Sequence, residues 1–135
     1  MARQFVIQIE NRPGELAHLT RALGARGIDI RHIASVSAGQ LASAFVTTSD
    51  DAATRAVLRG LGHQFIEGDM IVADVADRPG GFADAAEKLA AAHVNILGAL
   101  VVGRRPGVIE VAFSVDNEAA ALAALGLAGR SGLPR

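Results

Sequence analysis

The spacing of hydrophobic positions changes near the start of the chain. Apolar side chains occupy every second position from Phe5 to Ile9, which predicts a half-buried strand. A Pro-Gly turn follows, and leucines then recur at helical spacing from Leu16 to Leu23. This second pattern predicts a helix with one apolar stripe that needs a sheet to cover it.

The same pattern returns 66 residues later, with alternation from Ile71 to Val75 and helical spacing from Phe82 to Leu89. The turn repeats as well, because Asn11-Arg12-Pro13-Gly14-Glu15-Leu16-Ala17 recurs as Asp77-Arg78-Pro79-Gly80-Gly81-Phe82-Ala83. At the same offset, Leu23 falls on Leu89, Ile30 on Ile96, Val36 on Val102 and Asp50 on Asp116. A match in fixed register over about 40 positions indicates a duplication.

Each repeat carries the same further elements. We predict second strands over 28–37 and 94–102, turns over 38–40 and 104–107, third strands over 41–48 and 108–115, helices over 52–61 and 118–125, and a fourth strand over 64–67. The order β-α-β-β-α-β is the ferredoxin-like arrangement, an α+β fold with an antiparallel sheet and helices on one face. We expect two domains, residues 1–67 and 68–135.

The ends of these elements have their own signals. Pro13 and Pro79 suit the first turn of a helix, where the missing N–H is no loss. Asp50 and Asp116 are predicted N-caps of the second helices. A glycine-rich stretch follows Leu125, so the last strand of the second repeat is expected to be short or absent. An unpaired sheet edge favours self-association, and we expect a homodimer.

Composition narrows the classes of function. The chain has 13 basic and 14 acidic residues and neither Trp nor Tyr, which argues against nucleic acid as a partner. No stretch approaches the ~20 apolar residues of a membrane span, and no apolar leader follows Met1. We therefore expect a cytoplasmic protein without membrane contact. The absence of cysteine excludes disulfides, thiolate metal sites and cysteine nucleophiles.

The repeated segments resemble the ACT domain. The resemblance is carried by Asn11-Arg12-Pro13-Gly14-Glu15-Leu16 with Gly27-Ile28-Asp29-Ile30, and by Asp77-Arg78-Pro79-Gly80-Gly81-Phe82 with Val94-Asn95-Ile96. It covers the chain up to about Leu125 and implies a freestanding tandem pair. ACT domains are regulatory modules that bind amino acids and control metabolic enzymes. The resemblance therefore implies an amino-acid ligand, a metabolic enzyme as partner and no cofactor.

The resemblance also implies where the ligand binds. Paired ACT domains typically hold small molecules at the seam between their sheets, where the turn after the first strand faces the second strand of the neighbouring domain. The matching positions in the first repeat are Asn11, Gly14, Glu15, Leu16, Asp29 and Ile30. In the second repeat they are Asp77, Gly80, Gly81, Phe82, Asn95 and Ile96.

The residue types at the turn fit such a ligand independently. A glycine turn that enters a helix leaves backbone N–H groups free at the positive end of the helix dipole, where a carboxylate fits. Gly14 and Gly80 permit close approach because they have no Cβ. Asn11 and Asp77 carry oxygens that can accept hydrogen bonds from an ammonium group. The structural alternative is that Asn11 and Asp77 cap helices and Glu15 only interacts with the helix dipole.

The first repeat carries Asn11 and Asp29, and the second carries Asp77 and Asn95 at the matching positions. The amide and the acid are thus exchanged between the repeats. If turns meet second strands across a seam, Asn11 would face Asn95 and Asp77 would face Asp29. The two sites would then differ by about two charges, and we expect them to differ in affinity. The structural alternative leaves Asp29 and Asn95 simply exposed at strand edges.

Other candidate chemistry finds little support in the sequence. His18, His32, His63 and His93 lack the spacing of metal ligands, so no metal site is expected. The segment 104–107 is predicted to be a solvated hairpin turn whose two arginines could contact a partner. No Ser–His–Asp order, phosphate-binding loop or pair of acids stands out as a catalytic site.

Three functions remain. The leading one is a non-catalytic sensor that binds an amino acid at the seam between ACT domains and regulates a metabolic enzyme or another partner. The alternative is a purely structural assembly module without a ligand. An enzyme on the same fold comes third, because only fold analogy supports it.

Overall fold

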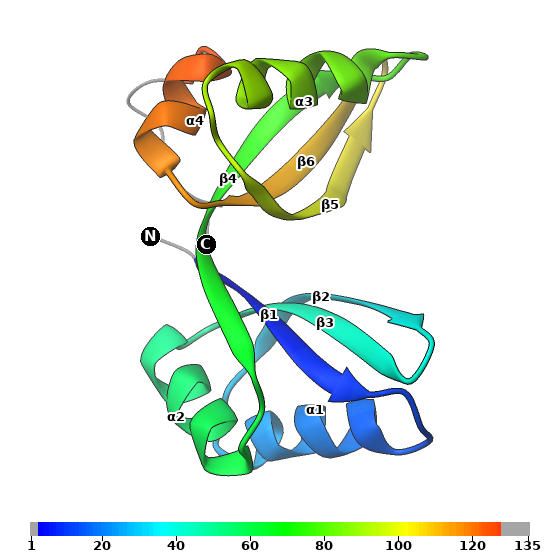
Figure 1. The fold of residues 1–135 in the computed structure, drawn as a ribbon, viewed down its shortest axis with the longest axis vertical. Helices are drawn as coiled ribbons and strands as arrows, with labels where there is room; N and C mark the ends of the chain where they lie inside the picture. The colour runs from blue at the N-terminus through cyan, green and yellow to red at the C-terminus, as the bar shows by residue number, and fades with distance from the viewer. Residues whose placement is uncertain (1–2, 128–135) are drawn as a thin grey trace. The chain divides into compact units, whose positions relative to one another are not determined.

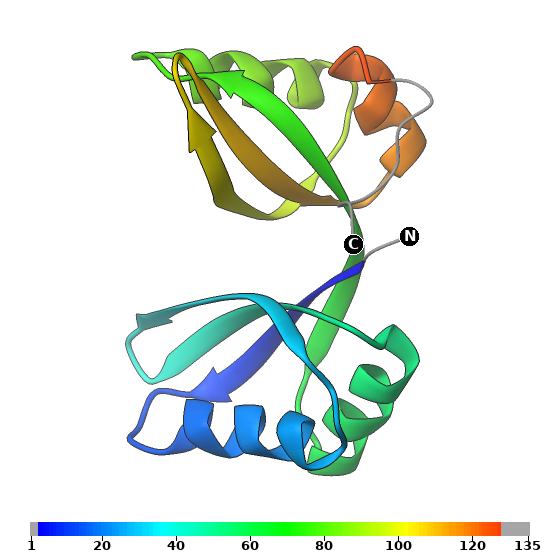
Figure 2. The same cartoon turned by 180° about the vertical axis from the view of Figure 1, so that it is seen from behind.

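The computed structural model describes residues 3–127 and divides into two compact units (Figures 1 and 2). The N-terminal unit is Gln4–Glu67. The C-terminal unit takes in the chain from Gly68 onward, together with the N-terminal residues up to Arg3. Within residues 3–127 the two units contain six strands and four helices, which confirms the predicted α+β fold with ferredoxin-like repeats.

The N-terminal unit has the full order β-α-β-β-α-β. Its elements are β1 (Arg3–Glu10), α1 (Glu15–Ala25), β2 (Ile30–Ala38), β3 (Leu41–Thr48), α2 (Asp51–Leu61) and the start of β4 (Phe65–Ala76). The strands lie in the order β2-β3-β1-β4, and both helices cover one face of this sheet (Figure 1). The other face, which we call the open face, carries no helix of this unit (Figure 2).

Alternation along β1 decides which side chains enter the core of the N-terminal unit. Phe5 and Ile7 are fully buried and pack with Leu19, Leu23 and other apolar residues of the helices. The intervening residues Val6 and Gln8 pair with Phe45 and Ser43 of β3 and therefore point to the open face. The predicted period of two is confirmed residue by residue.

The C-terminal unit repeats this order as far as the described residues reach. It contains the rest of β4, α3 (Gly81–Ala91), β5 (Ile96–Arg105), β6 (Val108–Val115) and α4 (Glu118–Ala124), with its strands in the order β4-β6-β5. Its core gathers Ile71, Leu89, Val111 and Phe113. From α4 to Leu127 the chain forms no strand. The rest of the segment predicted to lack one, residues 128–135, lies outside the described residues.

One strand, β4, serves both units. Near its start the N–H of Gln8 in β1 donates to the carbonyl oxygen of Gln64 at 2.9 Å, and from Asp69 onward the strand pairs antiparallel with β6. The sequence predicted two separate strands here, over 64–67 and around Ile71–Val75. The structure joins them without a turn although Gly68-Asp69 is a pair that can form one, because the chain is already paired with β6 from Asp69 onward.

The repeated Pro-Gly segments are type II turns before the helices, which corrects the prediction for the prolines. The N–H of Glu15 donates to the carbonyl oxygen of Arg12, and Gly14 has φ 91° and ψ −14°. Pro13 thus occupies the second position of the turn and Gly14 the third, where a positive φ is required. The segment around Gly80 has the same geometry, with φ 83° and ψ −8°. Pro13 and Pro79 therefore belong to the type II turns that precede the helices and not to the first turns of the helices themselves.

The second helices are capped by side chains, and one predicted cap is wrong. Asp50 accepts from the N–H of Ala53 as predicted, but α4 is capped by Asn117, which accepts from the N–H of Ala120. The reason is that β5 is one residue longer than β2 and carries bulges, so the offset between the repeats grows by one after the hairpin. Asp116 instead corresponds to Ser49.

We predict that Asn117→Ala removes about 1 kcal/mol of stability by uncapping α4. Amide hydrogen exchange of the full chain should show faster exchange at Ala120, whose N–H loses its partner. Asp116→Ala is the matched control, because Asp116 accepts from the N–H of Asn95 and should accelerate exchange there. Equal acceleration at Ala120 in both variants would contradict this assignment.

Candidate functional site

The first half of the predicted site lies where the type II turns meet the hairpins. The Asn11 side chain donates to the carbonyl oxygen of Gly39 at 2.9 Å, and the Asp77 carboxylate accepts from Arg104 at 2.8 Å. The backbone N–H groups of Asn11 and Asp77 donate to the carbonyl oxygens of Gln40 and Gly107. Both residues are exposed and fasten the turn to the neighbouring hairpin, so they do not cap helices.

The second half lies where the second strands begin. The N–H of Asp29 donates to the Ser49 hydroxyl at 2.9 Å, and the N–H of Asn95 donates to the Asp116 carboxylate at 2.9 Å. Ser49 and Asp116 return the bond from their own N–H groups to the carbonyl oxygens of Asp29 and Asn95. The backbone is therefore fixed at this end of the sheet, while the Asp29 and Asn95 side chains stay exposed.

The two halves lie at opposite ends of the sheet within each unit. In the N-terminal unit Asn11 is bonded beside the start of β3, and Asp29 is bonded just after its end. A strand of eight residues spans about 24 Å, so no ligand of amino-acid size touches both. A single unit therefore does not assemble the predicted site.

The apolar candidates have mainly packing roles. Leu16 and Ile30 are partly buried against the core of the N-terminal unit, and Ile96 packs against the core of the C-terminal unit. Phe82 differs, because 41% of it is exposed while its ring lies 5.7 Å from the Phe113 ring. Of these four, Phe82 offers the most surface to a ligand.

The starts of α1 and α3 are open to an anion, in contrast to those of α2 and α4. The residues at the capping positions, Gly14 and Gly80, supply no side-chain hydrogen bond, whereas Asp50 and Asn117 cap their helices. An uncapped first turn presents N–H groups at the positive end of the helix dipole. A carboxylate group could accept hydrogen bonds there.

An arginine lies over each of these turns, which the sequence analysis did not single out. Arg12 contacts Glu15 at 2.7 Å and Glu10 at 2.9 Å, and Arg78 contacts Asp84 at 2.6 Å. The hydrogen bond to Glu15, followed by the negative charge of Glu10, raises the pKa of Arg12. The recurrence of this arginine as Arg12 and Arg78 in both copies of the repeated motif is the feature of the sequence that could have indicated its role. These arginines balance the acids beside the turn.

A small hollow adjoins each turn. In the N-terminal unit it measures about 330 Å³ and its lining includes Glu10, Glu15 and His63. In the C-terminal unit it measures about 240 Å³ and its lining includes Arg78 and Gly81. Each uncapped helix start is thus next to space that a small molecule can enter.

The segment 104–107 is not a four-residue turn, which corrects another prediction. Arg104 and Arg105 belong to β5 and pair with Ile109 and Val108 of β6. Arg104 forms the ion pair with Asp77 described above. The two predicted sites therefore differ less in charge than the sequence implied, because Asp77 already has a cation beside it.

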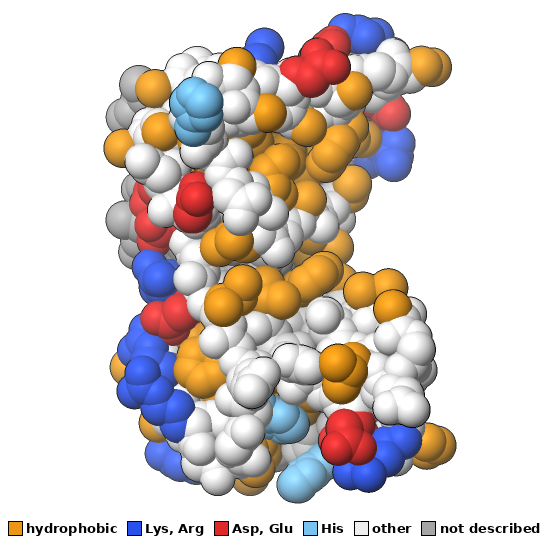
Figure 3. Space-filling view, viewed as in Figure 1, with side chains coloured by type: hydrophobic (Ala, Val, Ile, Leu, Met, Phe, Trp, Pro, Cys, Tyr) orange, Lys and Arg blue, Asp and Glu red, His pale blue; other side chains and the backbone are white. Residues whose placement is uncertain are grey.

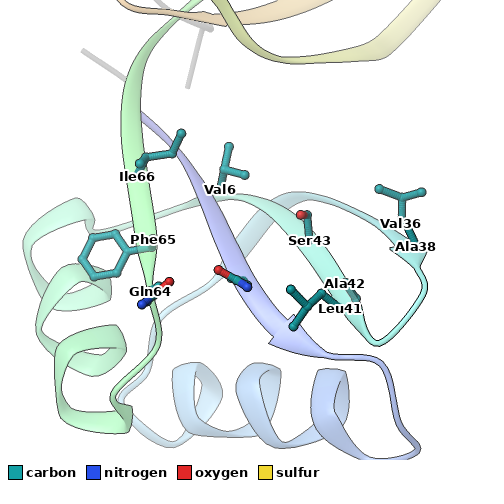
Figure 4. A pocket seen from close by; sticks show the side chains of 10 residues that line it. Val6, Val36, Ala38, Leu41, Ala42, Ser43, Gln64, Phe65 and Ile66 are labelled. Atoms are coloured by element: carbon teal, nitrogen blue, oxygen red, sulfur yellow. The ribbon is translucent and has the colours of Figure 1, made fainter.

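A larger hollow lies on the open face of the N-terminal unit, and the sequence analysis did not predict it. It measures about 530 Å³, and Figure 4 shows Val6, Val36, Ser43 and Ile66 pointing away from the helices around it. None of the ten residues that line it is charged. Apolar side chains also reach the surface on this side of the sheet (Figure 3).

Two further observations concern other kinds of site. Within residues 3–127, no group of three or more His, Asp or Glu side chains is placed to hold a metal ion. None of the helices in that part of the chain is both long enough and apolar enough to span a membrane.

Comparison with known proteins bears directly on the N-terminal unit. The family model of the ACT domain matches residues 4–59. This segment of the chain is therefore similar in sequence to the ACT domain. The match covers β1 to α2, which include the type II turn at Gly14, and ends before β4. No curated protein sequence matches the chain.

Solved structures resemble this chain over most of its length. Protein BT0572 from Bacteroides thetaiotaomicron is 20% identical with a TM-score of 0.69, over 93% of this chain and 86% of that chain. The ligand-free regulatory subunit of aspartate kinase from Thermus thermophilus is 22% identical with a TM-score of 0.62, over 96% and 93%. The corresponding subunit from Thermus flavus is 20% identical with a TM-score of 0.65, over 93% and 90%. At these identities the likeness shows the fold.

Proposed function

We propose that this chain is a tandem pair of ACT domains that binds an amino acid and regulates a partner. The ACT match lies in the N-terminal unit, and the C-terminal unit has the same element order and the same type II turn before an uncapped helix. Two of the similar structures are regulatory subunits of aspartate kinase. That likeness supports a regulatory and non-catalytic role.

The observation that carries the proposal is the pair of uncapped helix starts beside hollows. A ligand carboxylate would accept hydrogen bonds from the first N–H groups of α1 or α3. The ligand ammonium would donate to Asn11 or Asp77 and to the exposed Asp29 or Asn95 of another ACT domain. A ligand held between two domains binds the joined state more tightly than the separated state, which is what regulation requires.

The same proposal covers the partners and the location. The chain would act in the cytoplasm as a homodimer and contact a metabolic enzyme whose activity follows the concentration of the amino acid. Which of the twenty amino acids binds depends on side-chain contacts between domains.

A thermal-shift screen against the twenty amino acids tests this function. The chain has no Trp or Tyr, so the screen needs an extrinsic dye or calorimetric detection. A ligand at about 100 times its dissociation constant should add about 2.7 kcal/mol, a shift of several degrees for a domain of this size. We expect Asn11→Ala or Asp77→Ala to abolish the shift given by one selective amino acid.

Asn117→Ala is the control for that screen. It should lower the melting temperature by uncapping α4 but keep the ligand shift, which separates loss of stability from loss of binding. A flat screen on folded protein would contradict the sensor and favour the assembly module without a ligand. The hydrogen bond from Asn11 to Gly39 and the ion pair of Asp77 with Arg104 favour that second function, because both side chains already have structural partners.

A further inference from the structure

The four helices within residues 3–127 all end in the same backbone motif. A residue in the left-handed conformation donates its N–H to the carbonyl oxygen three residues back, and the next residue donates to the carbonyl oxygen five residues back. This is the Schellman motif, in which glycine is favoured because it has no Cβ. The left-handed residues, in chain order, are Gly27, Gly62, His93 and Gly126. Of the four helices, only α3 ends in a residue that has a side chain.

His93 adopts a backbone conformation that is costly for any residue except glycine. Its φ is 58°, and no other non-glycine residue in the described part of the chain has a positive φ. In this region the Cβ of an L-residue lies too close to the following carbonyl oxygen. The corresponding residue of the N-terminal unit is Gly27, which forms the same motif without that cost. The backbone therefore does not require histidine at this position.

Stability does not account for the imidazole of His93 either. The residue is exposed, and within residues 3–127 its ring takes part in no hydrogen bond or ion pair. A cation near the end of a helix interacts favourably with the helix dipole, but α3 already has Lys88 in its last turn. Helix α1, which has no basic residue there, ends in glycine. An exposed residue in a costly conformation, without a partner inside its unit, points to a role in binding.

The place of His93 in the fold connects it to the second half of the candidate site. It lies two residues before Asn95, at the end of the sheet where β5 begins, and Asn95 is exposed as well. The matching end of the N-terminal unit has Gly27 two residues before Asp29. That end presents a carboxylate, whereas the end in the C-terminal unit presents an imidazole and an amide, both of which can donate hydrogen bonds.

We propose that His93 contacts the amino-acid ligand at the Asn95 end and selects one whose side chain ends in a carboxylate or a carboxamide. The imidazole N–H and the amide NH2 group of Asn95 supply donors for the oxygen atoms of such a side chain. At the Asp29 end a ligand carboxylate would instead meet a like charge. The inference rests on the proposed function, because it requires an amino acid at the Asn95 end.

Calorimetric titration of the full chain with aspartate, asparagine, glutamate and glutamine tests this selectivity, with leucine as the control. Leucine has nearly the shape of aspartate and asparagine but no oxygen in its side chain. It should bind at least about tenfold more weakly than the best of the four, because the donors at His93 and Asn95 would lose their acceptor. Binding of leucine, or of any other amino acid outside the four, as tightly as the best of them overturns the proposal but leaves an amino-acid sensor in place.

Two variants separate the imidazole from the backbone conformation of His93. His93→Ala removes the imidazole and keeps the costly conformation, whereas His93→Gly removes both. Both should weaken binding of the selected amino acid about tenfold, while only His93→Gly should raise the melting temperature of the free protein. Gly126→Ala is the matched control, because it introduces the same strain at the end of α4, where an added Cβ meets no atom within 4 Å. It should lower the melting temperature and leave binding unchanged.

The outcomes distinguish this inference from the proposed function. If His93→Ala and His93→Gly bind the selected amino acid as tightly as the wild type, His93 only ends α3, and the inference is overturned while the sensor stands. A folded wild type that binds none of the twenty amino acids overturns both.

Discussion

Gly81→Ala is expected to destabilise the C-terminal unit by about 3 kcal/mol. A Cβ at this first residue of α3 would overlap the carbonyl oxygen of Ala76 and lie 3.0 Å from its carbonyl carbon. The obstacle is backbone, so no side chain can rotate away and the helix itself must shift. The corresponding residue of the N-terminal unit is Glu15, which shows that only α3 begins so close to its preceding strand.

Two other glycines give matched controls for Gly81→Ala. Gly14→Ala meets no atom within 4 Å but must adopt φ 91°, so it should cost about 1 kcal/mol. Gly60→Ala also meets open space, within α2 and without a positive φ, and should gain about 1 kcal/mol. Chemical denaturation of the full chain measures all three. A Gly81→Ala variant as stable as the wild type would contradict the close approach of α3 to β4.

Phe113→Ala is expected to cost about 3–5 kcal/mol, because it removes a fully buried ring from the core of the C-terminal unit. Phe82→Ala should cost less, since 41% of Phe82 is exposed. The two rings are in contact, so the double variant should lose about 1 kcal/mol less than the sum of the single losses.

The same pair of variants also bears on the ligand. If Phe82 lines an amino-acid site, Phe82→Ala should weaken the ligand-dependent thermal shift by more than its modest loss of stability explains. Phe113 is fully buried and offers no surface to a ligand. Phe113→Ala is therefore the comparison: it should lower stability without weakening the ligand-dependent thermal shift. If the double variant instead loses as much stability as the two single variants combined, the contact between the two rings, whose centroids lie 5.7 Å apart, contributes little.

The periodicity of apolar residues was sufficient to predict the strands and helices that bury one of their faces. The alternation from Phe5 to Ile9 and the leucines of α1 gave the right elements, because burial of a single face fixes which residues can be apolar. The third strands match their predicted bounds, 41–48 and 108–115. Boundaries set by backbone hydrogen bonds were harder, as the shift of the N-cap from Asp116 to Asn117 shows.

The candidate site was predictable only as far as local sequence determines it. The glycine turns and uncapped helices follow from the Pro-Gly motif, since φ above zero selects glycine. Partners distant in sequence were not predictable: the bond from Asn11 to Gly39 and the ion pair of Asp77 with Arg104 depend on where the hairpins lie. The uncharged open face of the N-terminal unit also depends on the register of β2 on β3, which local sequence does not determine.

The shared strand β4 constrains how a chain of this kind can change in length. Phe65 packs into one core, and Ile71, Ala73 and Val75 pack into the other, so the inward positions on both sides of the joint are odd-numbered. Inserting one residue between them would turn every later side chain of the strand to the opposite face, whereas inserting two would restore the inward set. Insertions or deletions at this joint should therefore come in pairs of residues.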